Sequence, residues 1–231
     1  MASGWRSRLE SLSWEPPPDP GGRVLVLSAH PDDEVLAIGG WLAGQTHRPV
    51  TFVTVTDGEA SHPGSPSLSE DDLRKRRPDE LLAALTVLGF TDPDIRRLGL
   101  PDGGVREAFP ELLDALRPLV AEADIVLAPF ESDGHPDHDA VGAAAMELCG
   151  DHTPVWRFPI WTWAWTQPGG QSWLPRVRRL TCSSTARVRK RQAIAMFETQ
   201  VEALSEHPAD AAVVFGVLLE HASFAPEAVV T

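Results

Sequence analysis

Short apolar runs alternate along the chain with longer segments whose apolar residues recur on one helical face. Runs rich in branched residues predict strands at 24–27, 50–56, 94–98 and 125–130. The segments that follow them predict helices at 35–40, 70–88, 108–121 and 140–148. Pro78 lies inside the second of these helices and predicts a break or kink there. Strands alternating with helices indicate an α/β fold: a Rossmann-like, mostly parallel sheet with helices on both faces.

The pattern changes after Gly150. Residues 155–165 alternate with a period of two, which predicts a strand carrying Trp161, Trp163 and Trp165 on one face. Such a row is more often part of a core than a platform for sugars. Further on, 176–183 predicts a strand, 185–200 predicts a helix, and 211–219 fits either. Residues 1–20, which include Pro16–Pro18, predict an N-terminal arm that is mostly extended or a short helix, followed by a single domain over 21–231.

Composition narrows the class of protein. The chain has 231 residues, 42% of them hydrophobic and 23% charged, which suffices for one large globular domain. A net charge of −13 argues against a general nucleic-acid binder. Two cysteines, Cys149 and Cys182, are too few for a disulfide framework. No signal peptide or membrane span is evident, so we expect a cytoplasmic location. The oligomeric state is not readable from the sequence.

Polar side chains follow two of the predicted strands. His30, Asp32 and Asp33 come directly after the first strand, and His135 and His138 lie in the segment after the strand at 125–130. Carboxyl ends of parallel strands meet at one edge of a sheet, where open α/β folds bind ligands. Carboxylates at 32–34 would also suit the first turn of a helix, so capping is the alternative reading of the first segment.

Together the two segments offer His30, Asp33 and His138 as metal ligands. Two imidazoles and one carboxylate match a catalytic zinc site that keeps one position open for water, although such sites also accept iron or cobalt. Bound zinc lowers the pKa of water to about 7. Asp32 is then placed as the general base. Protonated His135 would stabilise an oxyanion, with Asp137 fixing the tautomer of that ring and raising its pKa.

The motifs His-Pro-Asp-Asp-Glu at 30–34 and His-Pro-Asp-His at 135–138 resemble those of the PIG-L/LmbE family of zinc-dependent N-deacetylases. The resemblance extends well over 23–149 and loosely beyond. It implies zinc ligands at His30, Asp33 and His138, a base at Asp32, and a role for His135 with the reaction intermediate.

Two weaker similarities concern substrate binding. Arg77, in an Arg-x-x-Glu segment, resembles a family arginine that contacts substrate, and Asp102 resembles an aspartate that holds a sugar hydroxyl. The alternatives are a solvated helix arginine and an Asp-Gly turn. Some family members place a tyrosine near the intermediate; this chain has no tyrosine, and Asp133 stands two residues before His135.

Three functions remain as hypotheses. The first is a metal-dependent hydrolase that removes an N-acetyl group from an amino sugar or its conjugate, with zinc-bound water attacking the amide. The expected partner is therefore a small N-acylated, sugar-containing substrate. The second is an amidase acting on a non-acetyl amide in natural-product or thiol-conjugate metabolism. The third is a non-catalytic nucleotide-binding module, against which counts the lack of a Gly-x-Gly-x-x-Gly motif after the first strand.

Overall fold

One sheet organises the protein. The computed structural model describes residues 4–12 and 15–231. Its strands are β1 (Val24–Ser28), β2 (Val50–Thr54), β3 (Asp94–Arg97), β4 (Ile125–Pro129), β5 (Val155–Phe158), β6 (Val177–Arg179) and β7 (Ala228–Val230). They form a seven-stranded sheet in the order β3-β2-β1-β4-β5-β7-β6. Strands β1 to β5 are parallel, and β7 is antiparallel to β5 and β6. The predicted mostly parallel α/β fold is confirmed.

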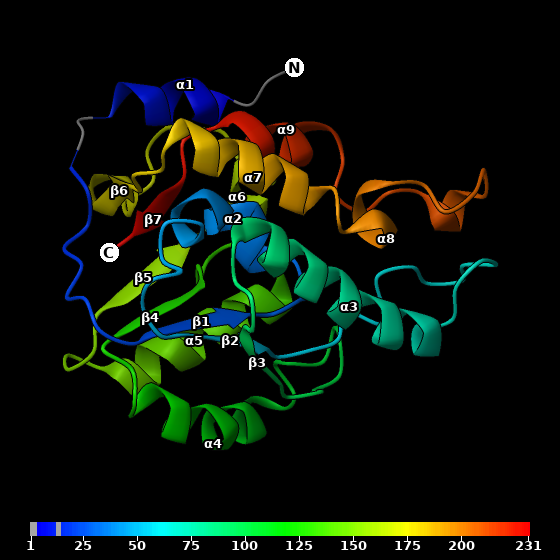
Figure 1. Ribbon diagram of the computed structural model, residues 1–231, viewed down its shortest axis with the longest axis horizontal. Coiled ribbons are helices and arrows are strands. Elements are labelled where there is room, and N and C mark those ends of the chain that lie inside the picture. The colour runs from blue at the N-terminus through cyan, green and yellow to red at the C-terminus, as the bar shows by residue number, and fades with distance from the viewer. Residues whose placement is uncertain (1–3, 13–14) are drawn as a thin grey trace.

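Helices cover both faces of this sheet. They are α1 (Gly4–Ser11), α2 (Asp33–Leu42), α3 (Glu70–Leu88), α4 (Phe109–Val120), α5 (Pro136–Cys149), α6 (Trp161–Trp165), α7 (Ser184–Ile194), α8 (Glu198–Val201) and α9 (Gly216–Phe224). Helices α4 and α5 lie on one face, and α2, α3 and α7 lie on the other (Figure 1). In β1, Val24 and Val26 enter the core under α2 and α3, whereas Leu25 and Leu27 enter the core above α4 and α5. Burial on both faces explains why this strand is apolar throughout.

The strand order sets the location of the site. From β1 the chain proceeds to β2 and β3 on one side, and from β4 to β5 on the other. Strands β1 and β4 are therefore neighbours at the point where the order reverses, with Val24 beside Ile125. Open α/β sheets bind ligands in the crevice outside the carboxyl ends of such a pair. Both motif segments leave the sheet there.

Helix α3 corrects one prediction, because it runs through Pro78 without a break in the helical assignment. Proline leaves the carbonyl four residues earlier without its helical donor. Here that carbonyl, on Arg74, accepts a hydrogen bond from Arg97 Nη2 at 3.4 Å. The helix begins at a reciprocal capping box between Ser69 and Asp72, which stabilises its first turn.

The predicted strand over 155–165 is confirmed only for its first four residues. The strand β5 stops at Phe158, and residues 161–165 form the short helix α6. The predicted strand over 176–183 is reduced to β6, and the predicted helix over 185–200 is divided into α7 and α8. The ambiguous region 211–219 contributes the start of α9.

The N-terminal segment contains a helix, as the second form of the arm prediction allowed. In α1, Trp5 and Leu9 are fully buried, and Trp5 Nε1 donates to the carbonyl of Thr166 at 3.0 Å. Trp5 also stacks on Trp173 with ring centroids 5.5 Å apart. These contacts hold α1 against the sheet edge that carries β6 and β7 (Figure 1). Residues 1–3 and 13–14 of the predicted arm lie outside the described residues.

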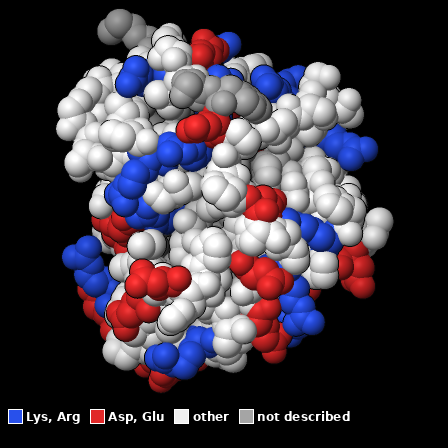
Figure 2. Space-filling model, turned by 90° about the vertical axis from the view of Figure 1, so that its left-hand side faces the viewer, with Lys and Arg blue, Asp and Glu red and all other residues white. Residues whose placement is uncertain are grey.

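Charge is mixed over the face that carries α1 and β6. Figure 2 shows acidic and basic side chains interspersed there. Among the described residues, no helix combines the length and apolar character that crossing a membrane requires.

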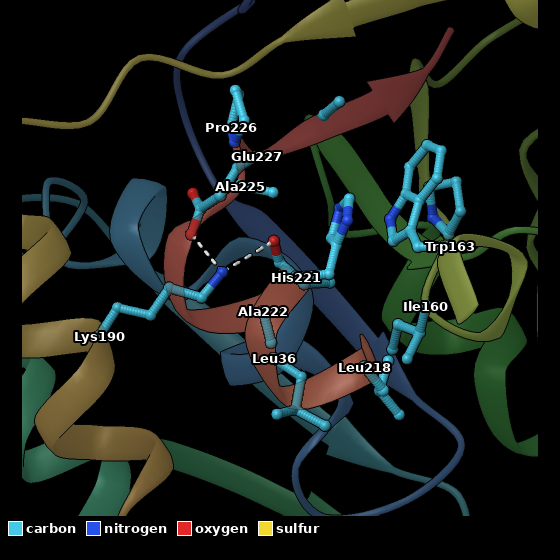
Figure 3. A pocket seen from close by; sticks show the side chains of 13 residues that line it. Leu36, Ile160, Trp163, Lys190, Leu218, His221, Ala222, Ala225, Pro226 and Glu227 are labelled. Atoms are coloured by element: carbon cyan, nitrogen blue, oxygen red, sulfur yellow. Dashed lines mark hydrogen bonds and ion pairs between the residues drawn. The ribbon is translucent and has the colours of Figure 1, made fainter. Parts of the chain in front are cut away.

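A buried ion pair reinforces α2 at an interruption of its backbone. Ile38 leaves helical geometry with φ −130°. Just beyond it, the N–H groups of Gly40 and Trp41 donate to the Glu227 carboxylate at 2.6 and 2.8 Å. Lys190 Nζ lies 2.8 Å from the same carboxylate and donates to the carbonyl of Ala37 (Figure 3). Glu227, which precedes β7, thus caps the second half of a helix near the other end of the chain.

Candidate active site

The end of β1 presents a tight polar turn. The N–H of His30 donates to Asp33 Oδ2 at 2.9 Å, and the His30 carbonyl accepts the N–H of Asp32. Asp32 occupies the N-cap position of α2, yet its side chain makes no capping hydrogen bond. Glu34 turns back to accept the hydroxyl of Ser28 at 2.6 Å. The Asp32 side chain therefore does not cap α2, whereas Asp33 and Glu34 do lie in the first turn of this helix, as the alternative reading expects.

The end of β4 leads into α5 through the second motif. His135 is the N-cap residue of α5, and its Nδ1 accepts the backbone N–H of Asp137 at 3.3 Å. His138 lies in the first turn of α5 and is completely buried. Helix α5 starts four residues earlier than predicted, so His138 belongs to the helix and His135 precedes it. The helix thereby sets the position of the His138 ring.

Three ligand atoms converge between the two strand ends. His138 Nε2 lies 3.3 Å from His30 Nδ1 and 3.2 Å from Asp33 Oδ1. A tetrahedral zinc ion with bonds of about 2.0–2.1 Å places its ligand atoms about 3.3 Å apart. His30, Asp33 and His138 therefore fit three corners of such a site, and their donor set suits a divalent cation. His30, His135 and Asp137 form a second group of close ligand atoms.

Carboxylates contact the other ring nitrogen of His30 and of His138, the one that is not part of the three converging ligand atoms. His30 Nε2 lies 3.1 Å from Asp102 Oδ1 and 3.4 Å from Asp137 Oδ2. His138 Nδ1 lies 2.8 Å from Asp133 Oδ2. Carboxylates in this position fix ring orientation and tautomer and raise the basicity of a metal ligand.

Asp137 contacts His135 through its backbone N–H, whereas its carboxylate lies against other groups. Its carboxylate accepts the N–H groups of Gly103 and Val105 at 2.8 and 3.3 Å and contacts His30. Burial and the neighbouring cationic rings of His138 and His30 lower the pKa of His135 to about 4. Asp137 opposes this shift but is outweighed. In the metal-free protein, burial and these two charged rings therefore oppose the protonated His135 that the sequence analysis expects.

The pKa values of His30 and His138 are raised, in contrast to that of His135. Burial lowers the pKa of His138, but Asp33 and Asp133 outweigh it and raise the pKa to about 9. Burial is also opposed at His30, where hydrogen bonds to Asp102 and Asp137 raise the pKa well above 6.5. A cation that binds here must displace protons from these rings.

Asp32 is paired with Arg77. Its Oδ2 accepts from Arg77 Nη2 at 2.9 Å, and both residues are buried. Burial raises the pKa of Asp32, while the Arg77 guanidinium lowers it by a smaller amount. Arg77 also donates to the carbonyl of Gly58 at 2.8 Å. A Cβ on Gly58, whose φ is +66°, would lie 1.7 Å from Arg77 Nη1, so glycine makes room for the guanidinium.

These groups face a cavity of about 300 Å³. It is lined by residues from both strand ends and from distant segments, among them Asp32, His135, Trp161, Gln200 and Val214. Arg77 and Asp102 also line this cavity. Its size is at the lower end of the range for small-molecule sites, about 300–1,000 Å³.

The three tryptophans at 161–165 do not share one face. Trp163 is buried beside Trp5, with ring centroids 5.0 Å apart, as the core interpretation predicted. Trp161 instead lines the cavity, and Trp165 stacks on it with centroids 4.6 Å apart. Spacing of four residues in α6 puts these two rings on the same side of the helix.

The fold and the site together define an α/β protein in which two histidines and one aspartate form a possible metal site, here called the metal-capable centre. This site lies where the strand order of the sheet reverses. Residues 25–149 match the family model described as PIG-L, GlcNAc-PI de-N-acetylase, and the chain belongs to this family.

Relatives of known name share this region. The chain is 33% identical over 132 residues to "Probable N-acetyl-alpha-D-glucosaminyl L-malate deacetylase 2" of Bacillus anthracis, covering 54% of this chain and 58% of the relative. It is 34% identical over 180 residues to 2'-N-acetylparomamine deacetylase of Streptomyces fradiae, covering 63% and 62%. The chain thus spans about three fifths of the length of these curated relatives.

A solved structure gives the same fold. The antimicrobial reagent A40926 pseudoaglycone deacetylase Dbv21 superposes with a TM-score of 0.61 at 27% identity. The similarity covers 82% of this chain and 86% of that chain. The arrangement of sheet and helices is therefore shared well beyond the two motifs.

Sequence reasoning missed the contacts of one residue. Asp133 is 2% exposed and accepts hydrogen bonds from His138 and from the N–H groups of Ile160, Trp161 and Thr162. The sequence signal for Asp133 was its position, as the second carboxylate after β4 and two residues before His135. The residues at the start of α6 that donate to Asp133 lie 27–29 residues away in the chain, which is too far for a short sequence motif to indicate the contact.

Proposed function

We propose that this protein is a metal-dependent hydrolase that removes the N-acetyl group from an amino sugar or an amino-sugar conjugate. The observation that carries the proposal is the convergence of His30 Nδ1, Asp33 Oδ1 and His138 Nε2 beside the buried carboxylate of Asp32. The relatives named as deacetylases of N-acetylated sugar compounds support the same reaction.

His30, Asp33 and His138 would hold the cation, which we propose to be zinc. Bound there, zinc supplies Lewis-acid chemistry: it polarises a carbonyl and lowers the pKa of water. The open side of the three ligands is where the substrate amide would enter from the cavity.

Asp32 is the proposed general base. Its pKa is raised by burial, which strengthens it as a proton acceptor, while the Arg77 guanidinium keeps its carboxylate oriented. The acceptor accessible to water is the carboxylate oxygen that Arg77 does not occupy. After the amide adds water, Asp32 returns the proton to the leaving nitrogen.

His135 is proposed to stabilise the oxyanion as a neutral donor. Since its Nδ1 accepts the N–H of Asp137, the ring proton resides on Nε2. That N–H is free to donate to the negative oxygen that develops on the amide carbon. A neutral ring does this without holding an ionic charge in a buried site. We propose Asp102 and Asp137 as positioning residues for His30, and Arg77 as the positioning residue for Asp32.

The test begins with metal analysis of the purified protein, followed by a hydrolysis screen of N-acetyl amino sugars beside longer acyl amides. Asp32→Asn should retain the metal and lose about 10²–10⁴-fold in kcat. Asp57→Asn is the matched control, since Asp57 is equally buried and accepts from Arg97 at 2.8 Å. Full activity of Asp32→Asn with metal bound rules out this base. Hydrolysis of the longer acyl amides in place of acetamides would replace deacetylation with a broader amidase activity.

A further inference from the structure

Two loops from distant parts of the chain form one side of the cavity. The first, here called the serine loop, is residues 59–69 between β2 and α3, and the second, the Asp210 loop, is residues 202–215 between α8 and α9. Figure 1 shows both loops extending beyond the sheet on the same side of the molecule. Together they contribute four residues to the cavity lining: Ala60, Ser61, Val213 and Val214.

Asp210 joins the two loops. Its carboxylate accepts the hydroxyl of Ser65 at 2.5 Å and that of Ser67 at 2.6 Å, both from the serine loop. It also accepts the hydroxyl of Ser205, from its own loop. The side chain of Asp210 is fully buried, although the loop that carries it lies at the surface. Three hydroxyl groups from two separate segments therefore surround one buried carboxylate.

The charge of this carboxylate favours the joined arrangement of the loops. Burial raises the pKa of Asp210, but the hydroxyls of its three serine partners outweigh burial and lower the pKa to about 2. The group is therefore ionised near neutral pH and accepts from all three hydroxyls. A buried carboxylate is costly unless its oxygens are hydrogen-bonded. Two of its three donors belong to the serine loop, so separating the loops would remove them.

The contact at Asp210 is connected to the cavity by a short length of backbone. The N–H groups of Val213 and Val214, which follow Asp210 by three and four residues, donate to the carbonyl of Gln200 at 2.9 and 2.8 Å. Gln200 lines the cavity, and its Nε2 donates to Ser61 Oγ at 3.3 Å. The loops are thus joined at two points, at Gln200 beside the cavity and at Asp210 farther along both loops.

Regular secondary structure does not replace these contacts. Apart from the 3₁₀ turn Pro208–Asp210, neither loop contains a helix or a strand, and the structure describes every residue of both. Loops with few buried apolar contacts and no ladder of backbone hydrogen bonds open locally at little cost in free energy. The position of this side of the cavity therefore depends on the side-chain contacts that join the loops.

We propose that Asp210 is a positioning residue for substrate binding, which joins the serine loop to the Asp210 loop and so keeps their four lining residues in place as one wall of the cavity. The inference rests on the proposed function for the use of this cavity by a substrate. Without the contact, the wall is in place for only part of the time, and the apparent affinity falls in proportion to that fraction. Asp32 and the metal-capable centre belong to other segments, so the bound substrate reacts at nearly the same rate.

The test measures hydrolysis of N-acetylglucosamine by the zinc-loaded protein. Asp210→Ala removes both acceptor oxygens; KM should rise about 10-fold if the wall is then in place a tenth of the time, and kcat should stay within about 2-fold. Ser67→Ala removes one donor of the serine loop and should raise KM by less, and Ser67→Thr, which keeps the hydroxyl, by less again. Glu206→Gln is the matched control, because it removes a negative charge at an exposed position of the same loop, and it should change neither constant.

Hydrogen–deuterium exchange tests the joining of the loops without any substrate. Exchange should become faster in both loops together in Asp210→Ala, while exchange in α4, on the opposite face of the sheet from α3, should not change. Faster exchange in the Asp210 loop alone, an unchanged KM, or a fall in kcat without a rise in KM overturns the proposal. If the original protein hydrolyses no N-acetyl sugar, the deacetylase is refuted, and the exchange result decides whether Asp210 joins the loops.

Discussion

Replacing Asp133 by Asn tests the link between the metal-capable centre and α6. The carboxylate accepts four hydrogen bonds, one from His138 and three from the backbone of residues 160–162. Asparagine has the same shape but one acceptor oxygen. Whichever way the amide is oriented, its NH2 group faces two of the four donors.

The magnitude follows from those two lost bonds. A hydrogen bond to a charged group contributes about 1.5–3 kcal/mol, so the variant should lose about 3 kcal/mol or more of unfolding free energy. Loss of the carboxylate behind His138 should also weaken zinc binding about 10- to 100-fold. The pKa of Asp133 is lowered in the fold, because its hydrogen bonds to His138 and to α6 outweigh burial. Its contribution to stability is therefore present above the ordinary aspartate pKa and is lost in acid.

Urea unfolding of the chelator-treated protein measures the first effect, and competition with a zinc indicator measures the second. Asp139→Asn is the control: Asp139 lies in the first turn of α5 and its carboxylate accepts the N–H of Gly134 at 3.0 Å. Both quantities should change much less in the control. Unchanged unfolding and unchanged zinc affinity in Asp133→Asn would show that the four contacts do not support the site, and the reasoning would be refuted.

Three other outcomes are expected. Arg77→Met leaves the Asp32 carboxylate buried without the guanidinium that pairs with it. The loss should raise the pKa of Asp32 further, destabilise the fold by about 3–5 kcal/mol, and move the acid limb of the pH–activity profile to higher pH. An acid limb that does not move contradicts the pairing. Zinc binding at pH 7 should release protons, because His138, with a pKa of about 9, is protonated in the metal-free protein. The zinc affinity should therefore fall as the pH is lowered. Calorimetry in buffers of different ionisation enthalpy measures the number of protons released, and a value of zero refutes the prediction. Burial lowers the pKa of His221 to about 3, so stability should fall as the pH drops from 6.5 toward 3, by about 2 kcal/mol at pH 5. His221→Phe, which preserves the stack on Trp163, should lose less stability than the original protein between pH 7 and pH 5, and an identical loss in urea titrations would exclude His221 as the cause.

The parts of the fold that local chemistry determines were predictable. Branched apolar runs located β1, β2 and β4, because a strand buried on both faces has few other sequences available. The proximity of His30 and His138 followed from placing both motifs at the carboxyl edge of a parallel sheet. All strands of a parallel sheet end at the same edge, and the alternation of strands and helices in the sequence was enough to predict such a sheet.

The remaining parts depend on contacts between distant residues. The spacing of Trp161 and Trp165 fits one side of a helix as well as one face of a strand, and the Asp133 carboxylate supports the helix by accepting the N–H groups at its start. The carboxylate contacts of Asp137 were not predictable from its adjacency to His135. In the first turn of a helix such neighbours point in different directions, so Asp137 reaches Gly103 and Val105 on another loop.

The contact between Glu227 and α2 has a consequence for how the chain tolerates alteration. Glu227 directly precedes β7, yet its carboxylate secures α2, the helix that begins at the turn carrying Asp32 and Asp33. Deleting the final strand, or displacing it with a fused tag, should disturb catalysis from a position that touches no substrate. An affinity tag is therefore better placed ahead of α1 than next to β7.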